Sequence, residues 1–223
     1  MKIVEYPDSE MMMMDLADKL ASELENTLLT HDRASLAVPG GTTPGPIFDS
    51  LSYVRIDWRR VDVMLTDERW VPEHSERSNT RLLRERLFVE RAADANYLPL
   101  YADAPNPEDR LDDLMQGLAP ALPISVMLLG MGADMHTASI FPGADQLEAA
   151  LNGDKSLVAM RAPGAPEPRI TLSAKVLNDA MNRHLVIIGA EKRAALERAQ
   201  NLSPQEAPVA AILPGTTIHW AES

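Results

Sequence analysis

The chain has 223 residues, and its 21 Lys and Arg against 33 Asp and Glu give a net charge of −12. A chain this acidic is a poor ligand for nucleic acid, whose phosphates are bound by clustered Lys and Arg, and it is repelled from anionic membrane surfaces. No cysteine is present, which excludes disulfides, thiolate chemistry and cysteine-ligated metal sites. The composition therefore predicts a globular protein without nucleic-acid or membrane partners.

The apolar segments are too short for a membrane anchor. Runs such as 124–129 and 185–188 end well short of the roughly 20 residues that a spanning helix needs. The N-terminal residues 1–6 contain no apolar stretch of the kind that begins a secretory signal. We therefore expect a cytoplasmic protein.

Helical and extended hydrophobic patterns alternate along the chain. Asp8 or Ser9 can cap a first helix, in which leucines recur every four residues between positions 16 and 28. In chain order, the predicted elements are helix 8–30, strand 34–38, helix 44–53, strand 61–65, helix 78–88, helix 106–118, strand 124–129, strand 156–160, a helix within 169–181, strand 184–188, helix 191–200 and strand 209–213.

The order of these elements predicts the fold class. Residues 124–129 show no alternation of polar and apolar side chains, which is typical of a strand buried on both faces. Strands that alternate with helices over short connections form right-handed crossovers and a parallel sheet. We therefore expect an α/β fold, a three-layer, mostly parallel Rossmann-like sheet with helices on both faces, in which residues 1–223 form a single domain.

Ligands of such sheets usually bind outside the carboxyl ends of the strands. The first strand end carries Gly40-Gly41-Thr42-Thr43 directly before a predicted helix. Adjacent glycines let backbone N–H groups approach an anion, and the helix N-terminus adds a favourable dipole. The segment predicts an anion site, and an ordinary tight turn capped by threonine is the alternative.

A charged cluster follows the second strand. Asp67, Glu68 and Arg69 come directly after the apolar run 61–65. We expect Arg69 to bind an anion or to stabilise an oxyanion, held by the neighbouring carboxylates. A surface network of ion pairs is the alternative.

The segment after strand 124–129 is the most informative. Gly130-x-Gly132 begins like a dinucleotide fingerprint but lacks the third glycine, because Met135 stands there. Asp134 and His136 flank that position, so the acid can orient an imidazole that acts as a base. A structural histidine is the alternative.

Two cations complete the candidate residues. Arg169 follows a proline-rich loop, and Lys192 lies in the first turn of a predicted helix, where the helix dipole disfavours a cation unless an anion is bound. A surface lysine that extends into solvent is the alternative for Lys192. Elsewhere, His31, His74, His184 and His219 have no histidine partner four residues away, so no metal site is predicted.

Taken in this order, the segments resemble the 6-phosphogluconolactonases of the glucosamine/galactosamine-6-phosphate isomerase superfamily. The resemblance extends from about residue 37 to residue 192, and its most specific part is the segment 130–143. The supporting segments are 40–44, 66–69 with 78–79, 169–171 and 189–192.

The resemblance implies hydrolysis of 6-phospho-D-glucono-1,5-lactone to 6-phospho-D-gluconate in the oxidative pentose phosphate pathway, with no cofactor because water is the nucleophile. It implies that His136 is the general base with Asp134 beside it, and that Arg69 holds the substrate or its oxyanion. It also implies a set of substrate and phosphate contacts: Gly40, Gly41, Thr42, Thr43, Asp67, Arg169 and Lys192. The implied partner is a small sugar-phosphate lactone, and both a monomer and a homodimer are compatible with it.

The chain departs from the family pattern at two positions. Pro39 replaces a serine that usually precedes the double glycine, which removes a hydroxyl and an N–H donor. Met135 replaces a glycine, and a methionine is strained there if the position requires a positive φ. We expect Met135 to be accommodated without a change in the geometry of the base.

Two alternative functions remain open. A glucosamine-6-phosphate deaminase shares the fold and phosphate turn but typically continues its motif into Asn-Glu-Pro, where this chain has 139–142 as Ser-Ile-Phe-Pro. A non-catalytic sugar-phosphate sensor would keep the phosphate turn and lose the base, whereas His136 and Asp134 are both present.

Overall fold

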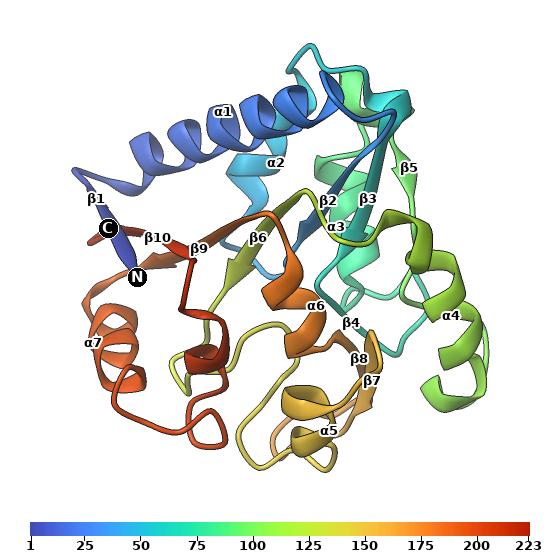
Figure 1. Ribbon diagram of the computed structural model, residues 1–223, viewed down its shortest axis with the longest axis vertical. Helices are drawn as coiled ribbons and strands as arrows, with labels where there is room; N and C mark the ends of the chain where they lie inside the picture. Colours follow the sequence, from blue (N-terminus) through green and yellow to red (C-terminus); the bar gives the residue numbers. More distant parts are fainter.

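The main sheet has seven strands, all parallel, in the order β1-β10-β9-β6-β2-β3-β5 (Figure 1). The computed structural model describes residues 1–223. The strands of this sheet are β1 Lys2–Tyr6, β2 Ala34–Val38, β3 Val61–Leu65, β5 Asn96–Tyr97, β6 Val126–Gly130, β9 Asn182–Ile188 and β10 Thr217–Ala221. The predicted α/β fold with a mostly parallel sheet is confirmed.

Helices cover both faces of the sheet. They are α1 Ser9–Leu28, α2 Gly45–Ser52, α3 Asn79–Arg86, α4 Leu111–Leu118, α5 Leu147–Asn152, α6 Ala174–Asp179 and α7 Ala190–Ala199. Figure 1 shows α1 and α2 on one face of the sheet, with α6 and α7 on the other. Asp8 caps α1 through its side chain, which accepts a hydrogen bond from Met11 N–H, and Ser78 caps α3 in the same way through Arg81 N–H.

A second sheet, antiparallel and three-stranded, has the order β4-β8-β7. Its strands are β4 Asp67–Arg69, β7 Leu157–Met160 and β8 Arg169–Leu172. Thr66 joins the two sheets, because its N–H donates to the carbonyl of Val38 in the main sheet and its carbonyl accepts from Leu172 N–H in the small one. The small sheet therefore begins where β3 ends, beside the carboxyl end of β2.

The structure corrects part of the predicted element order. Residues 209–213, predicted as the last strand, lie largely in a 3₁₀ turn, Pro208–Ile212, whose first residue is a proline. The last strand is β10, which follows the turn at Gly215 and pairs with both β9 and β1. The strands β1, β4, β5 and β8 and the short helix α5 were not predicted.

The core joins both sheets and their helices. A single cluster of buried apolar side chains runs from Met12 in α1 to Ala221 in β10. Every residue of β2 and β3 is buried, as is expected of central parallel strands that are covered on both faces. None of the helices combines the length and apolar composition that crossing a membrane requires.

Candidate active site

A pocket of about 270 Å³ lies at the carboxyl ends of β2, β6 and β9. The chain passes from β2 to its neighbour β3 on one side and from β6 to its neighbour β9 on the other, so the strand order reverses between β2 and β6. This is the place in an open parallel sheet where ligands are expected. Every candidate residue except Asp134 lines the pocket: Gly40, Gly41, Thr42, Thr43, Asp67, Arg69, His136, Arg169 and Lys192.

The two glycines of the turn between β2 and α2 are required for different reasons, Gly41 for its backbone conformation and Gly40 for lack of space. Gly41 has φ 87°, a conformation that favours glycine. A Cβ on Gly40 would lie 2.0 Å from Oδ1 of Asn79, so the Asn79 amide occupies the space beside this glycine. The amide is held there because its Nδ2 donates to the Asp67 carbonyl at 3.2 Å.

Two arginines lie side by side on neighbouring strands of the small sheet. Arg69 in β4 and Arg169 in β8 are direct partners in the antiparallel ladder. The Nε atoms of both are buried without a hydrogen-bond partner in the protein. Since an unpaired buried donor is costly, both guanidinium groups favour an incoming acceptor such as an anionic oxygen.

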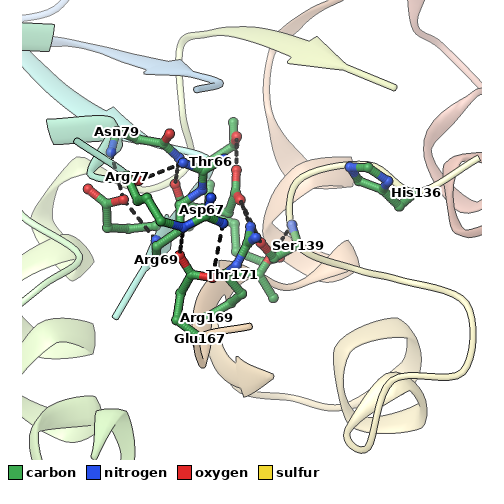
Figure 2. A network of polar contacts seen from close by, with 12 residues as sticks. Thr66, Asp67, Arg69, Arg77, Asn79, His136, Ser139, Glu167, Arg169 and Thr171 are labelled. Atoms are coloured by element: carbon green, nitrogen blue, oxygen red, sulfur yellow. Dashed lines mark hydrogen bonds and ion pairs between the residues drawn. The ribbon is translucent and has the colours of Figure 1, made fainter. Parts of the chain in front are cut away.

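The carboxylate of Asp67 lies beside Arg169. It accepts a hydrogen bond from Ser139 Oγ at 2.5 Å and lies 3.9 Å from Nη1 of Arg169 (Figure 2). Burial lowers the pKa of Arg169, and the negative charge of Asp67 opposes that effect. Asp67 therefore balances the charge of Arg169 and fixes the segment that carries Ser139.

The contacts of Arg69 differ from the expected ones. Neither carboxylate of the cluster forms an ion pair with its guanidinium, which instead donates from Nη1 to the Arg77 carbonyl at 2.6 Å. Glu68 is buried and accepts hydrogen bonds from the backbone N–H groups of Arg69, Asn79 and Thr80. Burial raises the pKa of Glu68, and these donors oppose that effect. Glu68 thus joins β4 to the N-terminus of α3, and its charge is not directed at the pocket.

His136 and Asp134 form a close pair. Nδ1 of His136 lies 2.5 Å from Oδ1 of Asp134, and this contact lowers the pKa of Asp134. Because an ionised carboxylate only accepts hydrogen bonds, Nδ1 is the donor. Nε2 of His136 has no partner in the protein, and the side chain is 28% exposed. Figure 2 shows His136 apart from the network that surrounds the arginines, with Ser139 between them.

Met135 adopts a left-handed conformation with φ 68°. The same residue accepts a hydrogen bond from Val209 N–H through its carbonyl, which ties it to the 3₁₀ turn 208–212. Asp134 and His136, on either side of Met135 in the sequence, are in contact although Met135 has this conformation.

Pro39, the other departure from the family pattern, is buried and lines the pocket.

Lys192 reaches the pocket from the first turn of α7. It forms no ion pair with a carboxylate of the protein, and Gly189 before the helix has φ 94°. The indole N–H of Trp220 donates to the Gly189 carbonyl at 3.1 Å, so β10 holds the turn that precedes Lys192. One ammonium group without an ion-pair partner and two guanidinium groups with unpaired Nε donors therefore line the same pocket, which suits a phosphorylated ligand.

Two residues of the site were not among the site residues predicted from the sequence. Asn79 lines the pocket and packs on Gly40, whereas the sequence indicated it only as a helix start and as part of the segment 78–79 that supports the family resemblance. Phe141 packs its ring on His136, with 4.3 Å between the ring centroids. No periodicity or spacing could have indicated that contact.

The chain is similar to proteins of one known family. The chain matches the family model described as "Glucosamine-6-phosphate isomerases/6-phosphogluconolactonase" over residues 7–220. A curated 6-phosphogluconolactonase from Rhizobium meliloti (strain 1021) is 40% identical over 215 residues, which cover 92% of each chain. Another from Pseudomonas aeruginosa is 39% identical over 92% of this chain and 88% of its own.

Solved structures also resemble this chain closely. A 6-phosphogluconolactonase from Shewanella baltica OS155 has a TM-score of 0.96 and 33% identity, covering 99% of this chain and 97% of its own. A monomeric glucosamine-6-phosphate deaminase has a TM-score of 0.81 at 16% identity, covering 99% and 97% respectively, and shares the fold. The match to the family model and these relatives show that the chain belongs to the glucosamine-6-phosphate isomerase/6-phosphogluconolactonase family.

Proposed function

We propose that the protein hydrolyses 6-phospho-D-glucono-1,5-lactone to 6-phospho-D-gluconate. The observation that carries the proposal is the 2.5 Å contact between Asp134 Oδ1 and His136 Nδ1, in a pocket that also contains Arg69, Arg169 and Lys192. Relatives named 6-phosphogluconolactonase at 40% and 39% identity support the choice of substrate.

His136 acts as the general base. Its Nδ1–H donates to Asp134, so the neutral imidazole presents a lone pair at Nε2. Nε2 takes a proton from water as the water oxygen attacks C1 of the lactone. Collapse of the tetrahedral intermediate breaks the bond between C1 and the ring oxygen, which takes the proton back from Nε2. The product acid ionises at neutral pH.

The three cationic side chains of the pocket have separate roles in stabilising the oxyanion and binding the phosphate. Arg69, whose buried Nε has no partner, stabilises the oxyanion that forms at C1. Arg169, Lys192 and the backbone N–H groups of Gly40 to Thr43 bind the phosphate. General-base assistance contributes about 10²- to 10⁴-fold to the rate, and binding through the distant phosphate orients C1 toward the base.

The proposal is tested with freshly generated 6-phosphogluconolactone and a pair of histidine variants. His136→Asn is expected to lower the enzyme-dependent rate at least about 10²-fold. His74→Asn, which changes an exposed histidine outside the pocket, is the matched control and should retain the wild-type rate. An unchanged rate in His136→Asn would exclude His136 as the base.

Ammonia release from glucosamine 6-phosphate is measured in parallel. Phe141 and Ile140 stand where a deaminase typically carries Glu and Asn, so no ammonia is expected. Lactone hydrolysis without deamination supports the proposal. Binding of 6-phosphogluconate without turnover of either substrate would instead favour a sugar-phosphate sensor.

The proposal treats residues 1–223 as one domain that acts in the cytoplasm, as a monomer or a homodimer, without nucleic-acid or membrane partners. The single buried apolar cluster between α1 and β10 supports one domain. The net charge of −12 supports the absence of polyanionic partners.

A further inference from the structure

We infer that Phe141 is a positioning residue that fixes the orientation of the His136 imidazole. The inference deepens the proposed function and rests on it, because it concerns the group assigned as the base. It starts from a contact that neither the fold nor the chemistry of the lactone requires. The ring of Phe141 lies on the imidazole, with centroids 4.3 Å apart and planes inclined by 33°.

The hydrogen bond to Asp134 alone does not hold His136. Asp134 lies two residues before His136 on the same loop, and its side chain is 54% exposed, so the hydrogen bond at Nδ1 leaves the two side chains able to move together, which would move Nε2. Gly132 restricts one side, since a Cβ there would lie 2.3 Å from Cε1 of His136. Phe141 provides an aromatic surface against the ring. The hydrogen bond and these two contacts together leave one direction for the Nε2 lone pair.

Phe141 is itself held by the small sheet. Ser139, two residues before it, donates from its backbone N–H to Thr171 Oγ1 at 3.1 Å and from Oγ to Asp67 at 2.5 Å. Ile140 is fully buried, and the Phe141 carbonyl accepts from Ala144 N–H. Residues 139–141 belong to the same loop as His136, and these contacts anchor that part of the loop to strands β4 and β8.

The same ring also contacts Arg169. The guanidinium carbon of Arg169 lies 5.6 Å from the centroid of Phe141, within the range of a cation–π interaction. Phe141 is thus a direct physical link between the proposed base and one of the proposed phosphate ligands. Arg169 holds the phosphate and His136 acts at the reacting carbonyl. Because the Phe141 ring contacts both side chains, it keeps these two ends of the substrate at a fixed separation.

The test compares Phe141→Leu, which keeps apolar volume and loses the ring, with Phe141→Tyr, which keeps the ring. Phe88→Leu is the matched control, because Phe88 also packs on an aromatic ring and an arginine, Tyr97 and Arg84, but lies outside the pocket. We expect Phe141→Leu to lower kcat about tenfold, Phe141→Tyr to restore at least half of it, and Phe88→Leu to keep the wild-type kcat.

Nuclear magnetic resonance of the ligand-free protein supplies a second readout that does not depend on turnover. The Hε1 signal of His136, identified by its loss in His136→Asn, should lose the ring-current shift from Phe141 in Phe141→Leu and keep it in Phe88→Leu. A wild-type kcat in Phe141→Leu, or a reduced kcat with the His136 signal unmoved, would overturn the inference.

The two proposals fail in different ways. If His136→Asn hydrolyses the lactone at the wild-type rate, the base assignment fails whatever the Phe141 variants do. If His136→Asn is impaired while Phe141→Leu is fully active, the base assignment stands and the positioning role of Phe141 is wrong. Unfolding curves of each variant show that losses of kcat come from folded protein.

Discussion

Nδ1 of His184 lies 3.0 Å from Nε2 of His219, and both side chains are buried. The pair belongs to a chain of polar contacts between the sheet and α1. Tyr6 contacts His219 Nδ1 at 2.9 Å at one end, and Glu23 contacts His184 Nε2 at 2.8 Å at the other. The two histidines therefore join β9, β10 and β1 to a helix, at a distance from the pocket.

This pair predicts a loss of stability in acid. Burial lowers the pKa of His219 to about 3, with further lowering by His184, Lys19 and Lys2 and an opposing effect of Asp15. An unfolded histidine titrates near pH 6.5, so below that pH the unfolded state binds a proton that the native state does not. The free energy of unfolding should fall by about 2 kcal/mol between pH 7.5 and pH 5 because of His219.

Urea unfolding at the two pH values measures this effect in the wild type and in His219→Gln, which does not titrate. The variant should be less stable at pH 7.5 but should lose about 2 kcal/mol less on acidification. His74→Gln, at an exposed position, is the control. An identical pH dependence in the wild type and His219→Gln would show that His219 titrates normally in the folded protein.

Met135→Gly should have little effect on catalysis. The left-handed φ of 68° costs a methionine about 1 kcal/mol, which glycine would relieve, but glycine adds a similar entropy to the unfolded chain. We expect a change in stability of less than about 1 kcal/mol and a kcat within about twofold of the wild type. Steady-state kinetics decide the question, because a large gain in kcat would mean that methionine distorts the Asp134–His136 pair.

Gly40→Ala should disrupt the pocket without unfolding the protein. The new Cβ would lie 2.0 Å from Oδ1 of Asn79, so the amide must leave the Asp67 carbonyl and enter the pocket. We expect kcat/KM to fall about a hundredfold. Gly117→Ala is the control, since a Cβ at that exposed helical position meets nothing within 4 Å and should stabilise α4 slightly. Wild-type kinetics in Gly40→Ala would show that the turn adapts.

Lys192→Met should weaken substrate binding more than turnover. A charge-assisted hydrogen bond to phosphate contributes about 1.5–3 kcal/mol, so KM should rise by about 10- to 100-fold with kcat within a few-fold of the wild type. Lys155→Met removes an exposed lysine outside the pocket and controls for the change in net charge. An unchanged KM would assign the phosphate to other groups.

Local patterns predicted the elements that are stabilised by their own sequence. The capped helix α1 has a leucine at every fourth residue, and the wholly buried strands β2 and β3 are short, mainly apolar segments; the structure confirms all three. β4 and β8 have three and four residues; β4 pairs only with β8, about a hundred residues later in the chain, and β8 pairs with both β4 and β7. No local pattern identifies such a pairing.

The apolar segment 209–213 was assigned wrongly for a related reason. Its β-branched and aliphatic residues favour a strand, but Pro208 begins a 3₁₀ turn, and the edge of β9 is taken by β10. The candidate residues, in contrast, lie in short motifs whose chemistry is visible in the sequence. The motifs do not indicate how side chains pack in the site, for example that Asn79 packs on Gly40 and Phe141 on His136.

The position of Thr66 at the junction of the two sheets bears on how the pocket can change within this family. The glycine turn follows β2 and the helix of Lys192 follows β9, both strands of the main sheet, whereas Arg69 and Arg169 lie in strands of the small sheet. Thr66 is hydrogen-bonded to both sheets. A substitution that shifts this junction would widen or narrow the whole pocket while every ligand-contacting side chain stayed the same. Homologues could thus acquire longer or shorter substrates through changes beneath the site, and a comparison of contact residues alone would not detect them.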